Sequence, residues 1–155
     1  MSHSTAFNHV GLCVTDRARS RRFYEELLGF TFWWELDAPD EPSERLLQLS
    51  PPIGLHATYL IRDGLVLELL DFSGREVVAP VGTRTMDEVG LTHISLSVSD
   101  LPGVLAQVAE FGGSVVEESR SDVAAMVRDP DGQLLELLTD AWQQYLPPVP
   151  SDRNE

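Results

Sequence analysis

Residues 8–16 read NHVGLCVTD and residues 92–100 read THISLSVSD, so the chain contains one apolar phrase twice. Each half also closes on a matched phrase, DGLVLELLD at 63–71 and DGQLLELLTD at 131–140. Both opening phrases place a histidine in an apolar strand pattern, and both closing phrases place a glutamate in one. The repeat predicts two copies of one structural module.

The elements expected in the first copy follow from hydrophobic periodicity and from residues that break it. Asp16 can cap a helix, and Gly29 can end it. Four prolines and several charges in the segment 37–52 predict a loop or lid. The expected elements are strands at 7–14, 30–36, 55–62 and 65–70 and a helix at 17–28, with an Asp63-Gly64 turn between the last two strands.

The second copy repeats this order, with Asp100 as the residue that can cap its helix. The expected elements are strands at 91–98, 115–118, 123–128 and 134–138 and a helix that ends near residue 111. Each half is therefore strand–helix–strand–strand–strand, which predicts an α+β fold of two tandem βαβββ modules. The expected boundaries are a first module at 6–72, a linker at 73–90, a second module at 91–140 and an extended C-terminal tail at 141–155.

Length, composition and charge limit the classes of function. A chain of 155 residues with 43% hydrophobic residues is typical of a globular protein. Its net charge of -14 repels phosphate backbones and anionic lipids, so neither nucleic acid nor membrane is expected as a partner. No apolar run approaches the roughly 18 residues of a spanning helix. The single cysteine, Cys13, and an N-terminus without signal-peptide features favour a cytoplasmic protein.

Two histidines and two glutamates at matching positions form a candidate metal site: His9 and Glu68 in the first copy, His93 and Glu136 in the second. A carboxylate inside an apolar strand is costly to bury unless it is paired or bound to a cation. Two glutamates neutralise one divalent ion, and imidazole with carboxylate suits Zn, Mn, Fe(II), Co or Ni. Duplication by itself could copy an idle histidine and glutamate, so a purely structural role stays open.

Two further stretches, FYEELLGF at 23–30 and RDPDGQLLEL at 128–137, resemble the vicinal oxygen chelate superfamily. This superfamily includes glyoxalase I, methylmalonyl-CoA epimerase, extradiol dioxygenases and bleomycin-type resistance proteins. The resemblance covers about residues 6–140. It implies two βαβββ modules that form a cupped mixed sheet around one divalent metal ion. Carried over by position, it implies the ligands His9, Glu68, His93 and Glu136.

The complete His-Glu-His-Glu set is most similar to the metal-dependent glyoxalase I-like and epimerase-like members. The resemblance therefore implies an enzyme, a lyase or isomerase that acts on a small vicinal-oxygen carbonyl substrate through an enediolate. Glu136 or Glu68 would act as the general base, with Glu136 slightly favoured. A homodimer is expected, and the modules could pair within one chain or across the dimer.

The chain departs from glutathione-using glyoxalases of the human type at Cys13 and Phe72, where that group has Arg and Asn. These departures argue against a glutathione hemithioacetal as substrate. One alternative function is a drug- or metabolite-binding resistance protein without chemistry, its cup lined by aromatic residues. The candidates for that lining are Phe32, Trp33, Trp34 and Tyr59.

A second alternative is an extradiol-type dioxygenase, although those enzymes have His where this chain has Glu68. Arg62 and Arg128, before the two Asp-Gly turns, could hold an anionic group, but solvated hairpin ends are the better interpretation. His56 precedes a strand and is expected at the surface, with a place in the lid as the alternative, and His3 is expected to be disordered.

Overall fold

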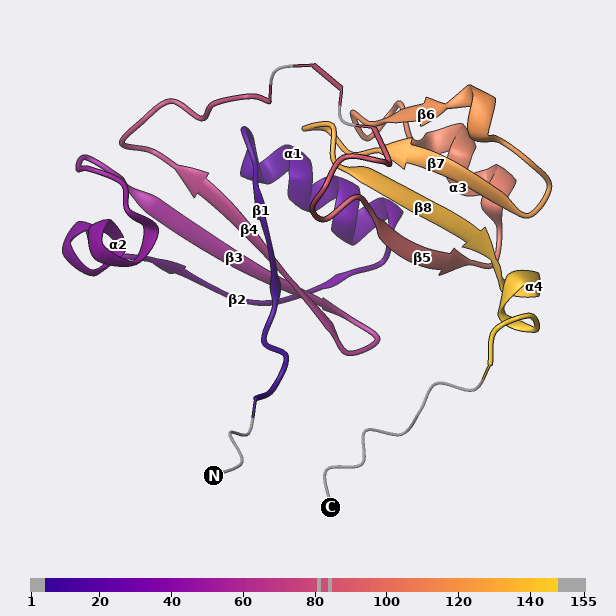
Figure 1. The fold of residues 1–155 in the computed structure, drawn as a ribbon, viewed down its shortest axis with the longest axis horizontal. Helices are drawn as coiled ribbons and strands as arrows, with labels where there is room; N and C mark the ends of the chain where they lie inside the picture. The colour runs from indigo at the N-terminus through magenta and orange to yellow at the C-terminus, as the bar shows by residue number, and fades with distance from the viewer. Residues whose placement is uncertain (1–4, 81, 84, 148–155) are drawn as a thin grey trace. The chain divides into compact units, whose positions relative to one another are not determined.

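Two four-stranded sheets of the same topology make up the protein (Figure 1). The structure is a computed structural model that describes residues 5–80, 82–83 and 85–147. His3 and the last part of the expected tail lie outside the described residues. The chain divides into two compact units, residues 1–83 and 84–155, and each unit contains one sheet.

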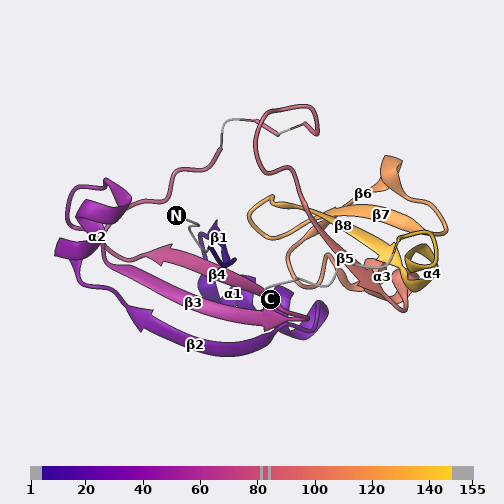
Figure 2. The same cartoon turned by 60° about the horizontal axis from the view of Figure 1, so that its bottom comes forward.

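In the first unit the strand order is β1-β4-β3-β2, with β1 parallel to β4 and the other neighbours antiparallel. The strands are β1 (Val10–Cys13), β2 (Thr31–Asp37), β3 (Leu55–Arg62) and β4 (Leu65–Phe72). The helix α1 (Arg17–Arg22) continues into a π-helical segment (Phe23–Leu27), and α2 (Asp40–Leu47) connects β2 to β3. Figure 2 shows α2 at one end of this sheet.

In the second unit the strand order β5-β8-β7-β6 repeats the same directions. The strands are β5 (Ile94–Val98), β6 (Ser114–Val116), β7 (Ala124–Arg128) and β8 (Leu134–Thr139). The helical elements are α3 (Leu101–Gln107), a 3₁₀ turn (Glu117–Ser119) and α4 (Asp140–Gln143). The shared topology confirms the predicted α+β fold of two tandem modules.

Matched aspartates begin the first helix of each unit, as the sequence predicts. Asp16 Oδ1 accepts a hydrogen bond from the Arg19 N–H at 3.0 Å, and Asp100 Oδ1 accepts one from the Gly103 N–H at 3.0 Å. Each carboxylate thereby satisfies a helix N–H that has no partner within the helix. After the first helix, Gly29 adopts the left-handed conformation with φ 72° and turns the chain into β2.

The helix α2 corrects the prediction of a loop over 37–52. Pro39 is the N-cap residue and Pro42 lies in the first turn, where a proline removes no intrahelical hydrogen bond. Asp40 and Glu41 lie in the first turn, where their negative charges interact favourably with the positive end of the helix dipole. The prolines therefore mark the start of a helix rather than exclude one.

The described residues form short helices, of four to eight residues in the α conformation. The π-helical segment takes over the second part of the helix predicted at 17–28. The short helix α4 begins at Asp140 and continues into the predicted extended tail, where Trp142 and Tyr145 make an edge-on ring contact. None of the helices in the described ranges is long and apolar enough to cross a bilayer.

Strand alternation places the hydrophobic core of the first unit on one face of its sheet. Leu67 and Leu69 of β4 are fully buried, as are Phe23 and Tyr24 of the adjoining helical segment. Successive strand residues point to opposite faces, so Glu68 projects away from this core.

The second unit repeats this arrangement. Leu135 and Leu137 of β8 are fully buried, together with Leu101 of α3 and Val108 just after it. Glu136, between the two leucines of β8, projects to the opposite face. The fold therefore places one candidate ligand from each closing phrase on the sheet face away from the helix.

Candidate metal centre

His9 and Glu68 lie side by side on the helix-free face of the first sheet. Gly11 of β1 is opposite Glu68 of β4, so His9, two residues earlier, shares the face of the Glu68 side chain. His9 Nε2 is 3.0 Å from Glu68 Oε2. The other ring nitrogen, Nδ1, lies 2.6 Å from Asn8 Oδ1. A proton on Nδ1 that is donated to Asn8 leaves the lone pair on Nε2, the form in which histidine binds a metal.

His93 and Glu136 repeat this pair in the second unit. Ser95 of β5 is opposite Glu136 of β8, and His93 Nε2 is 3.7 Å from Glu136 Oε2. The Nδ1 atom of His93 lies 2.9 Å from Thr92 Oγ1. The Ser95 hydroxyl donates a hydrogen bond to Glu136 Oε2 at 2.7 Å. Within each unit, the structure thus places one predicted histidine beside one predicted glutamate.

The two glutamates differ in burial. The Glu68 side chain is 12% exposed and the Glu136 side chain 34%. The apolar runs predict burial of both carboxylates, which is confirmed for Glu68 but not for Glu136. A buried carboxylate depends on its partners for stability, whereas a half-exposed one keeps part of its hydration.

Tyr59 is a site residue whose contact with Glu68 the sequence analysis missed. It is opposite Glu68 in the β3–β4 hairpin, and its hydroxyl donates a hydrogen bond to Glu68 Oε1 at 2.5 Å. Burial, and then the bond to Glu68, raise the pKa of Tyr59 to about 12. The hairpin register offered a signal, because Tyr59 and Glu68 are equally far from the predicted Asp63-Gly64 turn.

Aromatic rings surround Tyr59 on the same face. The Trp34 ring stacks on it with centroids 4.7 Å apart and 3° between the planes, and the His9 ring meets its edge at 5.6 Å. Trp33 also contacts Tyr59, at 6.3 Å, because the strand pairing is irregular between Phe32 and Trp34. Phe32 has a different neighbour, the Arg21 guanidinium, which lies over its ring at 4.8 Å.

The remaining sequence candidates have local partners. His56 lies between Asp37, 2.7 Å from Nδ1, and Glu35, 3.4 Å from Nε2. In the first hairpin Arg62 Nε donates to Asp63 Oδ2 at 3.4 Å. In the second, Arg128 Nη1 donates to the Gly132 carbonyl at 3.0 Å. Both arginines therefore stabilise hairpin ends, and the exposed Cys13 ends β1.

The donor set of the two pairs fits a divalent ion of the first transition row. Imidazole nitrogen with carboxylate oxygen is a combination that Zn, Ni, Co, Mn and Fe(II) accept. Across residues 5–80, 82–83 and 85–147, no group of three or more His, Cys, Asp or Glu side chains is arranged to hold a metal. Within its own unit, each pair therefore offers two ligands.

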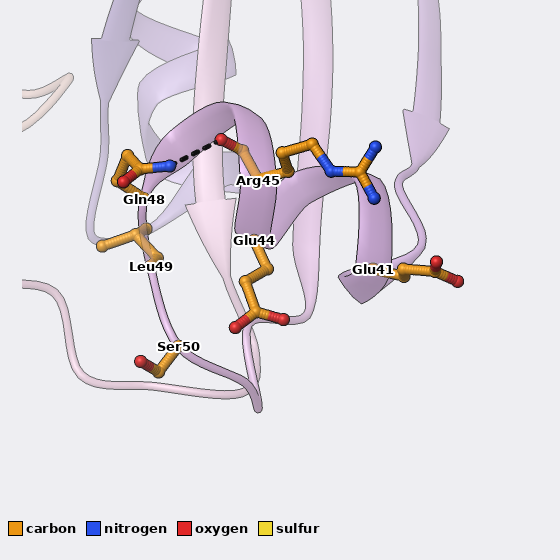
Figure 3. A pocket seen from close by; sticks show the side chains of 6 residues that line it. All are labelled: Glu41, Glu44, Arg45, Gln48, Leu49 and Ser50. Atoms are coloured by element: carbon orange, nitrogen blue, oxygen red, sulfur yellow. Dashed lines mark hydrogen bonds between the residues drawn. The ribbon is translucent and has the colours of Figure 1, made fainter.

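A shallow hollow beside α2 lies apart from these residues in the first unit (Figure 3). Gln48 ends α2 in the left-handed conformation, and its side-chain amide donates to the Arg45 carbonyl at 2.8 Å. This bond satisfies a carbonyl at the helix C-terminus. The lining residues are Glu41, Glu44, Arg45, Gln48, Leu49 and Ser50. No candidate ligand is among them.

Comparison with known sequences supports the duplicated fold. The Glyoxalase/Bleomycin resistance protein/Dioxygenase superfamily matches residues 6–137. Lactoylglutathione lyase GLX1 of Arabidopsis thaliana is 29% identical over 138 residues, 85% of this chain and 43% of the lyase. The chain thus spans less than half the length of that relative. The uncharacterized protein YaeR of Escherichia coli is 29% identical over 135 residues, 84% of this chain and 92% of YaeR.

Solved structures show the same architecture. Glyoxalase I of Leishmania major has a TM-score of 0.65 and 26% identity, covering 92% of this chain and 91% of that enzyme. The fosfomycin resistance protein FosX of Listeria monocytogenes, complexed with Mn(II) and sulfate, has a TM-score of 0.61 and 14% identity, covering 94% and 100%. That identity shows the fold alone. The chain belongs to the Glyoxalase/Bleomycin resistance protein/Dioxygenase superfamily.

Proposed function

We propose that this protein is a divalent-metal-dependent lyase or isomerase that acts on a small carbonyl compound with vicinal oxygens. The proposed ligands of the metal ion are His9, Glu68, His93 and Glu136. The observation that carries the proposal is that both units pair a histidine Nε2 with a glutamate Oε2, at 3.0 Å and 3.7 Å. Two carboxylates and two neutral imidazoles balance the charge of one divalent ion.

The metal would supply Lewis acidity, which polarises a carbonyl oxygen and makes the neighbouring C–H group more acidic. We assign the proton transfer to Glu136. Its side chain is 34% exposed and therefore open to a substrate, whereas Glu68 is 12% exposed and bonded to Tyr59. Glu136 would accept the proton from carbon and return it to the neighbouring carbon, as general bases do in such isomerisations.

The substrate class follows from this chemistry and from the relatives. The Arabidopsis relative is a lactoylglutathione lyase, and the Leishmania glyoxalase I is described as trypanothione-dependent. Both names connect related proteins with thiol carriers. Cys13 and Phe72 stand where glutathione-using glyoxalases of the human type have Arg and Asn. We therefore propose to screen α-hydroxycarbonyl compounds, acyl thioesters and hemithioacetals of several thiols, in a protein we expect to be a homodimer.

Metal analysis of untagged protein tests this proposal. Wild-type protein is incubated with Ni, Co, Zn, Mn or Fe(II), dialysed and measured by elemental analysis. About one ion per site is expected in the wild type and a clear loss in Glu68→Ala and His93→Ala. The exposed Glu110 provides a matched control, so Glu110→Ala is expected to retain the metal. A wild type that binds none of the five metals would contradict the proposal.

A ligand-binding protein without chemistry is the second candidate. The observation that favours it is the exposed aromatic surface beside Glu68, where Trp33 is 56% and Trp34 42% exposed. Flat apolar ligands commonly bind to such rings. Two results together would favour this function over the enzyme. The metal-free wild type binds a ligand that Trp34→Ala no longer binds, and no compound in the screen is turned over.

A further inference from the structure

We propose that Tyr59 is a positioning residue for Glu68, holding one carboxylate oxygen so that only the other is available to a metal ion. This inference rests on the proposed function, since it assigns a role within the same ligand set. It concerns a residue outside the four ligands, and it distinguishes the two glutamates from each other.

The contacts of Glu68 divide cleanly between its two oxygens. Oε1 accepts the hydrogen bond from the Tyr59 hydroxyl, and Oε2 lies 3.0 Å from His9 Nε2. A carboxylate can bind a metal through one oxygen or through both. Because Oε1 is hydrogen-bonded to a neutral donor, Oε2 remains as the oxygen that can bind a metal ion together with His9.

The Tyr59 ring is fixed in place by its neighbours. Trp34 stacks on it in parallel at 4.7 Å, and the His9 ring meets it edge-on at 5.6 Å. A rotation of Tyr59 away from Glu68 would break both ring contacts. The hydroxyl is therefore preorganised, and holding Glu68 in one orientation requires little further ordering.

In the described part of the second unit, no tyrosine is opposite Glu136. Met126 is opposite Glu136, in the place that Tyr59 has opposite Glu68, and a thioether cannot donate a hydrogen bond. Glu136 instead accepts a bond from Ser95 on Oε2, the oxygen that also lies near His93. Equivalent glutamates thus have different supports: Glu68 is 12% exposed and has a separate partner on each oxygen, whereas Glu136 is 34% exposed and has both contacts on Oε2.

Gly11 provides independent support from the other side of Glu68. A Cβ atom added at Gly11 would lie 3.3 Å from Glu68 Oε2. That distance is short for a contact with an oxygen that must also reach a metal ion. The matching residue in the second unit, Ser95, carries the side chain that bonds to Glu136. In the first unit, where Tyr59 supports Glu68, the glycine therefore leaves the space beside Glu68 Oε2 open.

Cobalt binding tests the proposal without any assay of turnover. Co²⁺ affinity is measured by competition with a coloured chelator, and the visible absorption of bound Co²⁺ reports its coordination. Tyr59→Phe is expected to weaken binding about 10-fold to 100-fold, as for other groups that support metal ligands. In this variant Glu68 Oε1 could also coordinate the ion, and this change in coordination would alter the Co²⁺ spectrum. The matched control is Tyr145→Phe, because Tyr145 is 73% exposed in the other unit.

A double-substitution cycle separates positioning from a general loss of structure. In the Glu68→Gln background, Tyr59→Phe is expected to cause little further loss of Co²⁺ affinity, because Tyr59 acts through the carboxylate. Gly11→Ala leaves Tyr59 in place and is expected to weaken Co²⁺ binding by crowding Oε2. Full additivity in the cycle, or wild-type affinity in Gly11→Ala, would overturn the proposal.

The outcomes also separate this proposal from the proposed function. A wild type that binds no Co²⁺ overturns both. If the wild type binds Co²⁺ and a folded Tyr59→Phe variant binds it with equal affinity and an unchanged spectrum, the role of Tyr59 is overturned. The proposed metal site is not affected by that result. Thermal unfolding of each metal-free variant shows whether it is folded.

Discussion

At the scale of single residues, two glutamates at equivalent positions have different surroundings. Glu68 and Glu136 occupy the same position in the closing phrase of each half, between leucines that are fully buried. Their surroundings differ because Tyr59 faces one and Met126 faces the other. Duplication therefore supplied two similar carboxylates, and their neighbours distinguish them.

Glu136→Gln is expected to lower kcat by about 10²-fold to 10⁴-fold while the metal content stays near that of the wild type. Glutamine keeps an oxygen donor in place but cannot accept the proton. Glu68→Gln is expected to weaken metal binding instead, since the ligand that Tyr59 positions is altered. Elemental analysis and turnover of the same preparations check both expectations. Wild-type turnover by Glu136→Gln at full metal occupancy would refute the assignment of Glu136 as the base.

At the scale of elements, one carboxylate ties α2 to the start of β3. Asp40, in the first turn of α2, accepts hydrogen bonds from the backbone N–H groups of Gly54 at 3.0 Å and Ile53 at 3.2 Å. These bonds, the one from Gly54 first, lower the pKa of Asp40. The ionised side chain thereby stabilises a helix that follows Pro39 and contains Pro42.

The Asp40 contact predicts an acid-dependent stability. Because the pKa of Asp40 is lower in the folded protein, its stabilisation is present above the unfolded pKa of about 3.9 and disappears as pH falls through the folded pKa. Asp40→Asn should therefore be less stable than wild type at pH 7, with a difference that shrinks toward pH 3. Urea unfolding over this pH range measures the difference. A gap that is constant with pH would contradict the assignment.

Hydrophobic periodicity predicted most elements because it depends on neighbours along the chain. The strand at 55–62 agrees with β3 at both ends, and the Asp63-Gly64 turn is confirmed. The sequence pattern did not reveal α2, since prolines are compatible with the first turn of a helix. It also gave no sign of the irregular pairing at Trp33, which depends on how β2 meets β3.

At the scale of the whole molecule, each unit contains its own apolar core. Leu67 and Leu135 are matched in sequence and fully buried. Leu67→Ala and Leu135→Ala are each expected to lower the free energy of unfolding by about 2–5 kcal/mol, because each leaves a cavity. Leu46 is 82% exposed, so Leu46→Ala is the control and should change stability by less than about 0.5 kcal/mol.

Denaturant unfolding measures these changes with probes in both units. Trp33 and Trp34 report on the first unit, and Trp142 reports on the second. Equal stability of Leu135→Ala and wild type would show that the second core does not contribute as its burial indicates. The same result for Leu67→Ala would contradict the core assignment in the first unit.

The sequence by itself determined the duplication and the α+β class, because strand alternation and helix caps depend on residues close together in the chain, and it supplied the four candidate ligands. Only the tertiary structure decided which groups contact the Glu68 and Glu136 carboxylates. Tyr59 reaches Glu68 through hairpin register, and Ser95 reaches Glu136 through a parallel pairing of distant segments. Such contacts depend on how strands meet in space, and strand periodicity alone does not specify them.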